Sequence, residues 1–348
     1  MTSPIRTSRF RAVSAGEKAH AVRVSVGLMV PGLLLVAVGR PDLIIYAVFG
    51  SFTGMYGRAD SRALRLLHQS QGAVLLLAGT ATGIALARWH AGTVPVVVVA
   101  TLFAIGGSMV ADFFALRPEG PFYGVFALGA LAGVPSTLTT PAVGWLIAAG
   151  AAALAILIGL GSAAASTDPG RRIHHAVRRQ RVRQRSAAFV HAGRYAIAVA
   201  LAGSLAHAVA LGHVNWAIAG AVVTLASADP RERLRRGLHR MAGTLAGLAV
   251  TALLLLPGLS PRPLALLVIL LLFPTELFMA VNYALALSFF TPMIMVMTEL
   301  ADPIGIKELL TTRALGTVLG VLCGLAVNYC VRDRSAARRG AHRRTQGA

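Results

Sequence analysis

Two carboxylates stand where long apolar segments of the chain end. Asp112 follows the uncharged run 93–111, and Glu276 follows the apolar segment 262–275. An ionisable side chain beside hydrocarbon is costly, so it is a functional candidate by default. If both carboxyls are buried, their protonated forms become accessible near neutral pH, and the two acids become candidates for proton coupling. The alternative is that both acids cap helices and face water.

A second group of polar residues interrupts otherwise apolar segments. Arg313 lies near the outer end of the last apolar segment. There a cation could attract an anionic solute, or it could extend to the membrane interface. The other residues could line a path for a polar or aromatic solute, although hydrogen bonds between helices explain them equally well. They are His207, Asn215, Asn282, Tyr123 and Tyr283.

Two loops, 58–68 and 229–240, carry arginines at helical spacing. Such charges fix the orientation of membrane segments and bind anionic lipid headgroups. The sharper alternative is a cytoplasmic vestibule that concentrates anionic substrates. The arginines concerned are Arg58, Arg62, Arg65, Arg233, Arg235 and Arg236.

The elements that position these residues are predicted to be membrane-spanning helices, which makes the fold an all-α integral membrane protein. Of 348 residues, 56% are hydrophobic and only 13% are charged, and the mean hydropathy is +0.69. Uncharged runs of about 18–20 residues can cross a hydrocarbon core about 30 Å thick, and backbone groups in lipid must bond within their own segment. The expected twelve spans are 21–39, 42–57, 70–87, 93–111, 120–134, 141–163, 192–211, 213–228, 241–256, 262–275, 280–298 and 312–331.

Four of these spans are short: the second, fifth, eighth and tenth. The tenth and eleventh nearly touch at Pro274. The short spans would require tilt or a locally thinned bilayer. Ten spans with re-entrant segments are therefore the alternative topology.

The net charge of +20 is explained by topology and not by nucleic-acid binding. With the amino terminus inside, 28 of the 33 Lys and Arg residues fall on the cytoplasmic side. Positive charge accumulates on cytoplasmic loops. This distribution predicts an even number of spans with both termini cytoplasmic, in the plasma membrane of a bacterium. The anionic headgroups of that bilayer are an expected partner.

The chain also matches itself at an offset of 171 residues. Residues 23–72 align with 194–243 at eleven of 50 positions, and the matches include Arg23 with Arg194 and Gly72 with Gly243. An even number of spans in each half makes the two six-helix repeats parallel. The predicted divisions are a cytoplasmic segment 1–20, a first repeat 21–165, a basic linker 166–191, a second repeat 192–331 and a basic tail 332–348.

Motifs for enzymatic chemistry are missing from the sequence. It contains no H-E-x-x-H metal motif, no glycine-rich phosphate loop with lysine and no G-x-S-x-G element. We therefore expect no catalytic residue, no metal and no cofactor.

Residues 22–67 resemble the opening of FUSC-family membrane proteins, relatives of the fusaric acid resistance proteins and aromatic acid exporters. The similar features are the turn 39–42, Phe49-Gly50 and the end of the second span at 56–58. The second half resembles the family's repeated domain through Trp216, the loop 229–240 and Arg313. The resemblance implies six spans per half and proton-driven efflux of aromatic or other organic acids. It extends to plant aluminium-activated malate channels, in which two six-span halves flank an anion pore.

The sequence thus favours an exporter of small organic anions, including aromatic ones. Two rivals remain open. A passive anion channel would need no proton gradient and would carry much larger currents. A membrane scaffold that binds acidic lipids or partner proteins would show no flux and would depend on residues 332–348. Substrate and oligomeric state stay open.

Overall fold

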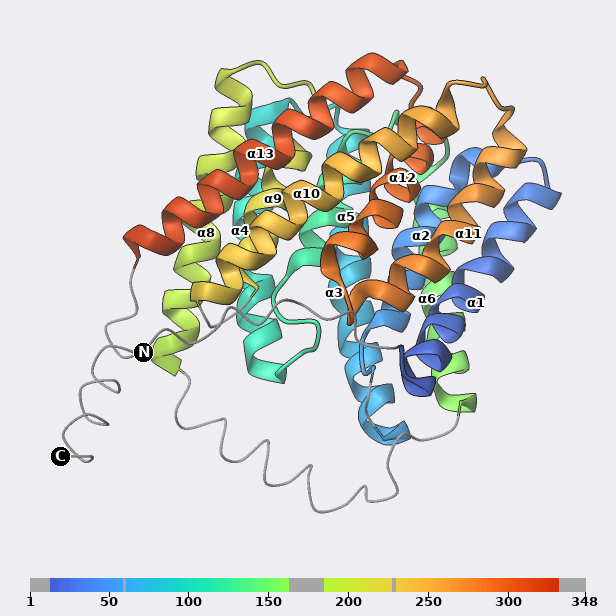
Figure 1. Cartoon of the computed structure of the whole chain (residues 1–348), viewed down its shortest axis with the longest axis horizontal. Helices are drawn as coiled ribbons and strands as arrows, with labels where there is room; N and C mark the ends of the chain where they lie inside the picture. Colours follow the sequence, from blue (N-terminus) through green and yellow to red (C-terminus); the bar gives the residue numbers. More distant parts are fainter. Residues whose placement is uncertain (1–12, 59–60, 163–184, 227–229, 332–348) are drawn as a thin grey trace, which may run out of the picture.

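The computed structural model describes residues 13–58, 61–162, 185–226 and 230–331, without the side chains of 185–187 and 230–233 (Figure 1). Twelve α-helices and two short 3-10 helices make up this part of the chain. They are α1 (Ala15–Ala37), η1 (Pro41–Leu43), α2 (Ile44–Ser51), η2 (Phe52–Met55), α3 (Arg62–Arg88), α4 (Thr93–Phe114), α5 (Phe122–Ala132), α6 (Pro141–Gly161), α8 (Arg185–Ala208), α9 (Val214–Leu225), α10 (Pro230–Leu255), α11 (Pro261–Met279), α12 (Tyr283–Ala301) and α13 (Ile306–Cys330).

Local sequence explains where several helices begin. Ser14 and Glu17 form a capping box at the start of α1, in which the Glu17 amide donates to Ser14 Oγ at 3.2 Å. Thr140 accepts from the Val143 amide ahead of α6. The Asn282 side chain accepts from the Leu285 amide at 3.1 Å and so starts α12. Each cap satisfies an amide that has no partner within its own helix.

Nine of the helices in the described part are long and apolar enough to cross a membrane. The three others, α2, α5 and α9, have 8, 11 and 12 residues, which is about 12–18 Å at 1.5 Å per residue. All residues of α2 and α9 are buried, as are nine of the eleven residues of α5. Neighbouring helices therefore separate the short helices from lipid, and their length requires no thinned bilayer.

The expectation that the tenth span is short was wrong. Helix α11 has 19 residues and continues through Pro274 to Met279. Five other helices begin at least five residues earlier than predicted: α1 at Ala15, α3 at Arg62, α8 at Arg185, α10 at Pro230 and α13 at Ile306. The expected segment 1–20, linker 166–191 and tail 332–348 fall largely outside the described residues.

Close packing of the short helices depends on glycines. Gly50 of α2 faces the backbone of Ala148 in α6, and Gly320 of α13 faces the backbone of Ala217 in α9. At either glycine an added Cβ would overlap a carbonyl oxygen of the neighbouring helix. Small residues of this kind let membrane helices approach closely.

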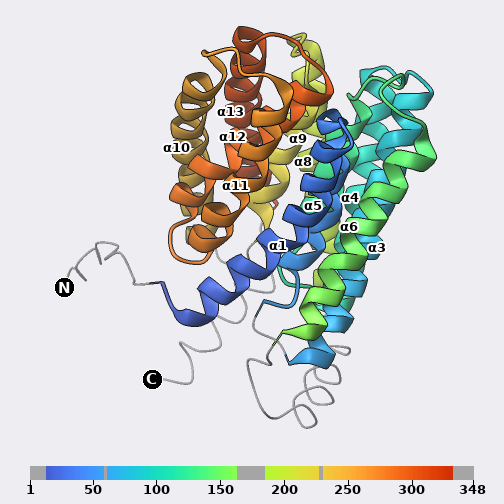
Figure 2. The ribbon, with the colours of Figure 1, turned by 90° about the vertical axis from the view of Figure 1, so that its right-hand side faces the viewer.

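Helices of the amino-terminal and carboxy-terminal parts of the chain make their most extensive contacts at two places. Helix α1 packs against α11, and α8 packs against α4. Figure 2 shows α10–α13 gathered on one side and α3, α4 and α6 on the other, with α1 between them. These two contacts join the amino-terminal and carboxy-terminal parts of the chain, and both carry pairs of ionisable residues described below.

Candidate functional site

Arg313 lies in the protein interior and not at the membrane interface. Its side chain is 0% exposed. The guanidinium carbon stands 4.4 Å from the ring centroid of Trp216 in α9. Within the described residues, none of its three guanidinium nitrogens has a hydrogen-bond partner. The predicted position of Arg313 in a solute path is therefore compatible with its surroundings, whereas extension of the side chain to the interface is excluded.

A second buried arginine, Arg240 of α10, faces the same region. It is 1% exposed, and its guanidinium carbon stands 5.5 Å from the ring centroid of Phe122. Its Nε and Nη2 atoms find no acceptor in the part of the chain that the structure describes. Arg240 and Arg313 repel each other electrostatically. Two like charges thus share one low-dielectric region, where an anion between them would be strongly stabilised.

Other hydrogen-bond donors surround the two arginines. Thr244 follows Arg240 by one turn, and Thr317 follows Arg313 by one turn; both hydroxyls and the Trp216 indole Nε1 are buried without a partner among the described residues. We call Arg240, Thr244, Trp216, Arg313 and Thr317 the donor cluster. Guanidinium and indole groups can only donate. The chemistry of the donor cluster therefore favours a ligand that supplies acceptors, such as an anion.

Aromatic rings form the apolar wall next to the donor cluster. The Phe126 ring lies 6.1 Å from Trp216 and stacks on Phe122 at 5.5 Å. Phe290 of α12 and Phe52 of η2 extend this wall, with centroids 6.0 Å apart. Aromatic pairs at these separations attract one another beyond simple area burial. A ligand that carried both a ring and an acid group could contact the wall and the donor cluster together.

Two tyrosines connect this region with Glu276. Tyr123 is within electrostatic range of Glu276 and of Tyr283, and Tyr283 is within range of Arg313. Tyr123 is 8% exposed, and Tyr283 is half-buried. The structure thus brings Tyr123, Tyr283, Glu276 and Arg313, all predicted separately from the sequence, into one connected interior region.

The side chain of Glu276 contacts a histidine that the sequence reasoning missed. His20 Nε2 of α1 lies 3.1 Å from Glu276 Oε2 of α11, and each side chain is only 2% exposed. On its other face, His20 Nδ1 lies 3.4 Å from Nη2 of Arg23. Arg58 donates to the Glu276 backbone carbonyl at 2.8 Å. Glu276 is therefore a buried partner in a polar contact and does not simply cap a helix towards water.

Asp112 has the same kind of partner at the other inter-segment contact. Its Oδ2 lies 3.0 Å from Nδ1 of His191 in α8, and the exposed fractions of these side chains are 26% and 20%. The second ring nitrogen, Nε2, lies 3.3 Å from the Leu225 carbonyl oxygen. The two predicted acids are therefore not paired with each other, and each lies beside its own histidine.

Comparison with known proteins identifies the part of the chain that holds most of this chemistry. Residues 196–327 match the family model described as fusaric acid resistance protein-like. This segment is a fusaric acid resistance protein-like domain. With nine candidate spans in the described residues, the chain is a multi-pass membrane protein. No curated protein and no solved structure matched it.

All five residues of the donor cluster belong to the fusaric acid resistance protein-like domain, as does Glu276. The aromatic wall is shared, because Phe122 and Phe126 come from α5 outside the matched range. The domain therefore supplies the cations, and the amino-terminal part of the chain supplies much of the apolar surface beside them.

The three remaining path candidates in this domain differ in position. His207 is exposed near the end of α8 and contributes nothing to the interior region. Asn215 is buried on α9 next to Trp216, against Gly129 of α5. Asn282 uses its side chain to cap α12. Of these three residues, only Asn215 is both buried and adjacent in sequence to a member of the donor cluster, Trp216.

The expectation that 58–68 and 229–240 are loops was wrong for most of their length, because α3 begins at Arg62 and α10 begins at Pro230. Two of their arginines make structural contacts instead of facing lipid. Arg65 is 1% exposed and donates to the carbonyl of Gly57, in the turn after η2, and to that of Gly159, in the last turn of α6. Arg236 donates to the Ala226 carbonyl at the end of α9 of the domain. The other predicted arginines are Arg58, which is half-buried, Arg62 and Arg235, which are exposed, and Arg233, whose side chain lies outside the described residues.

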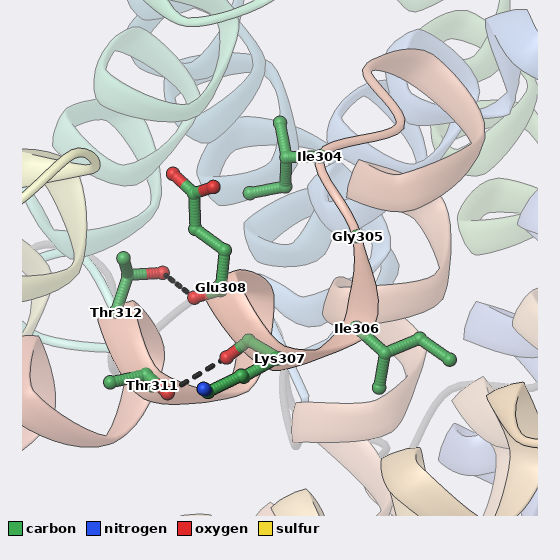
Figure 3. A pocket seen from close by; sticks show the side chains of 7 residues that line it. All are labelled: Ile304, Gly305, Ile306, Lys307, Glu308, Thr311 and Thr312. Atoms are coloured by element: carbon green, nitrogen blue, oxygen red, sulfur yellow. Dashed lines mark hydrogen bonds between the residues drawn. The ribbon is translucent and has the colours of Figure 1, made fainter.

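A surface hollow of about 530 Å³ opens at the start of α13 (Figure 3). Lys307 and Glu308 line it, and Thr312, which precedes Arg313, contributes to its wall. In Figure 3 the Thr312 hydroxyl donates to the Glu308 carbonyl. The hollow is thus a surface opening one residue away from Arg313 along the domain's last helix.

His213 belongs to the loop between α8 and α9 near this end of the domain. Burial lowers the pKa of His213, while nearby Asp302 and Glu308 act in the opposite direction. The imidazole is therefore mainly neutral at pH 7. Its ring lies 6.3 Å from Trp216.

Proposed function

We propose that the protein exports small organic anions, including aromatic carboxylates, across a bacterial plasma membrane. The observation that carries this proposal is the donor cluster, in which buried cations and donors lack acceptors among the described residues. A buried guanidinium without an acceptor is costly, because it has lost its hydration shell. A carboxylate between Arg240 and Arg313 would supply acceptors and balance charge.

The aromatic wall supports the same substrate class. A benzoate-like solute would place its carboxylate on the guanidinium groups and its ring among Phe122, Phe126 and Trp216. Guanidinium–carboxylate hydrogen bonds are charge-assisted and geometrically specific. The match to the fusaric acid resistance protein-like family favours transport over an enzymatic role.

Two parallel six-helix repeats are part of the proposal, and the helix packing supports them. Packing pairs among α1–α6 recur among α8–α13: α2 packs on α6 as α9 packs on α13, and α3 packs on α5 as α10 packs on α12. The contacts between the two proposed repeats correspond in the same way. Helix α1 of the first packs on α11 of the second, and its counterpart α8 packs on α4, the counterpart of α11. A two-fold relation of this kind places a solute path between the repeats.

Proton coupling is the proposed source of energy. Asp112 and Glu276 each lie at a contact between the two repeats, where movement of one repeat against the other would alter their surroundings. With both chain termini cytoplasmic, as the arginine distribution predicts, inward proton movement could drive outward anion movement. The hollow beside Lys307 and Glu308 is the proposed outer opening.

Radiolabelled anion flux into proteoliposomes tests the proposal. Benzoate, cyclohexanecarboxylate and acetate carry the same charge, and we expect benzoate to move fastest because the wall is aromatic. Arg313→Met should lower benzoate flux at least about tenfold, since a charged hydrogen bond contributes about 1.5–3 kcal/mol. Arg88→Met, which alters an exposed arginine at the end of α3, is the matched control.

The outcomes separate the rival functions. Absence of flux for every anion in the wild-type protein would refute transport. Flux that survives in Arg313→Met would remove the donor cluster from the path. Anion current that needs no pH gradient would instead indicate a channel.

A further inference from the structure

The two histidine–carboxylate pairs occupy corresponding places in the chain. His20 and His191 are 171 residues apart, as are Arg23 and Arg194, so the offset of the sequence repeat extends to them. His20 meets the acid on α11, and His191 meets the acid on α4. Although the pairs correspond, the second ring nitrogen of each histidine has a different hydrogen-bond partner. This difference determines how many protons each pair holds.

The His20–Glu276 pair holds one proton. Arg23 Nη2 lies 3.4 Å from His20 Nδ1, and a guanidinium can only donate, so Nδ1 acts as the acceptor and carries no hydrogen. One proton then remains between Nε2 and Glu276 Oε2, which are 3.1 Å apart. His20 is accordingly a neutral imidazole beside a carboxylate.

The His191–Asp112 pair holds two protons. Nε2 lies 3.3 Å from the Leu225 carbonyl oxygen, which can only accept, so Nε2 carries a hydrogen. A second proton lies between Nδ1 and the Asp112 carboxylate, at 3.0 Å from Oδ2. Because an imidazole is more basic than a carboxylate, the second proton belongs on Nδ1, which makes His191 an imidazolium beside a carboxylate.

The position of one arginine accounts for the difference. Arg23 turns towards His20, whereas its counterpart Arg194 donates twice to the Val331 carbonyl, at 3.0 and 2.7 Å. A guanidinium beside an imidazole opposes a second proton through like charge. His191 does not receive that contact, and its neighbour is instead the Tyr195 ring at 4.9 Å.

Other ionisable groups near the His20–Glu276 pair include a cation, an acid and a tyrosine. Arg58 lies near His20 and donates to the Glu276 carbonyl, and it adds positive charge there. Glu17 on the same helix is 9% exposed and is bonded to Ser14. Tyr123 of α5 is within electrostatic range of Glu276. Arg23 remains the group in direct contact with the ring nitrogen that would accept another proton.

We propose that His20–Glu276 and His191–Asp112 are two proton-binding sites that differ by one proton in this conformation, and that the arginine beside each histidine sets its occupancy. A proton reaching His20 must displace Arg23 from Nδ1. Coupling of this exchange to anion movement rests on the proposed function, whereas the difference in occupancy does not.

Nitrogen NMR of the full-length protein labelled with ¹⁵N-histidine in lipid bilayers tests the proposal without any transported anion. His20→Gln and His191→Gln assign the two signals by difference. At pH 7 we expect His191 to show two protonated ring nitrogens and His20 to show an unprotonated Nδ1. Equal protonation of both rings, or the reverse pattern, would overturn the proposal.

Two variants probe the cause. Arg23→Gln should increase the fraction of doubly protonated His20 at fixed pH, and Asp112→Asn should decrease that of His191. Arg62→Gln, which changes an exposed arginine on α3, should leave both signals in place. An unchanged His20 signal in Arg23→Gln would show that Arg23 does not set the occupancy. If the NMR pattern is as expected but no anion moves, only the proposed function fails.

Discussion

Replacing Arg313 with methionine should make the protein more stable and less active at once. The substitution removes a fully buried cation whose nitrogens lack acceptors in the described part of the chain. The penalty for burying an ion is several kcal/mol, and the stacked contact with Trp216 returns about 2 kcal/mol. The substitution removes the burial penalty, the Trp216 contact and the repulsion from Arg240. The net effect should be to raise the free energy of unfolding by about 2 kcal/mol.

Arg194 provides the matched control because it is the same residue type at nearly equal burial. It is 6% exposed, but its guanidinium donates twice to the Val331 carbonyl. Arg194→Met should therefore lower the free energy of unfolding by about 2 kcal/mol, since it removes charged hydrogen bonds. The two substitutions are chemically identical, and the main difference between the two sites is whether the guanidinium has an acceptor.

Denaturation in mixed lipid–detergent micelles measures both variants against the wild-type protein. Benzoate should add stability to the wild type by mass action, about 2.7 kcal/mol at one hundred times its dissociation constant, and should add little to Arg313→Met. If Arg313→Met is destabilised as much as Arg194→Met, Arg313 has a structural role and the reasoning from its missing acceptors is refuted.

Three further predictions concern packing, pH and coupling. Gly320→Ala should force α13 away from the Ala217 carbonyl and lower the unfolding temperature, whereas Gly150→Ala, whose Cβ meets nothing within 4 Å, should raise it slightly. Burial disfavours protonated His213 in the folded protein, so stability should fall as pH drops below about 6.5, where the unfolded chain gains the proton; His213→Asn should flatten this dependence in thermal unfolding scans at pH 5–8. Neutralising Asp112 and Glu276 together, as Asn and Gln, should abolish flux driven by a pH gradient; an unchanged rate in vesicles would remove both acids from coupling.

Apolar segment length predicted the helices well because the lipid constraint is local. Each of the twelve expected spans contains a helix, and the match to the fusaric acid resistance protein-like family confirms the resemblance over 196–327. The burial of α2, α5 and α9 was not predictable in the same way. Their sequences are apolar throughout, and only the packed neighbours determine that no face of α2 or α9 meets lipid.

The candidate site was predicted in part. Arg313 is an isolated charge in an apolar segment, so its position alone marks it. Arg240 ends the basic segment 229–240, so the orientation of the chain in the membrane already explained its charge, and its burial was not expected. His20 could have been found by extending the repeat alignment three residues towards the amino terminus. Its pairing with Glu276 could not have been found from the sequence, because no local residue pattern indicates that α1 packs against α11.

The short buried helices explain how the side chains of Arg240 and Arg313 can stay inside the protein instead of extending to the membrane interface. A guanidinium on a lipid-facing helix lowers its energy by extending to water. Trp216 on α9 and Phe122 on α5 instead place aromatic faces over Arg313 and Arg240 within the protein. These contacts place the guanidinium carbons 4.4 and 5.5 Å from the ring centroids, and they leave N–H donors of both arginines without acceptors among the described residues. An acceptor can then reach those donors only through the protein interior, so the proposed export would require the helices around Arg240 and Arg313 to move relative to one another.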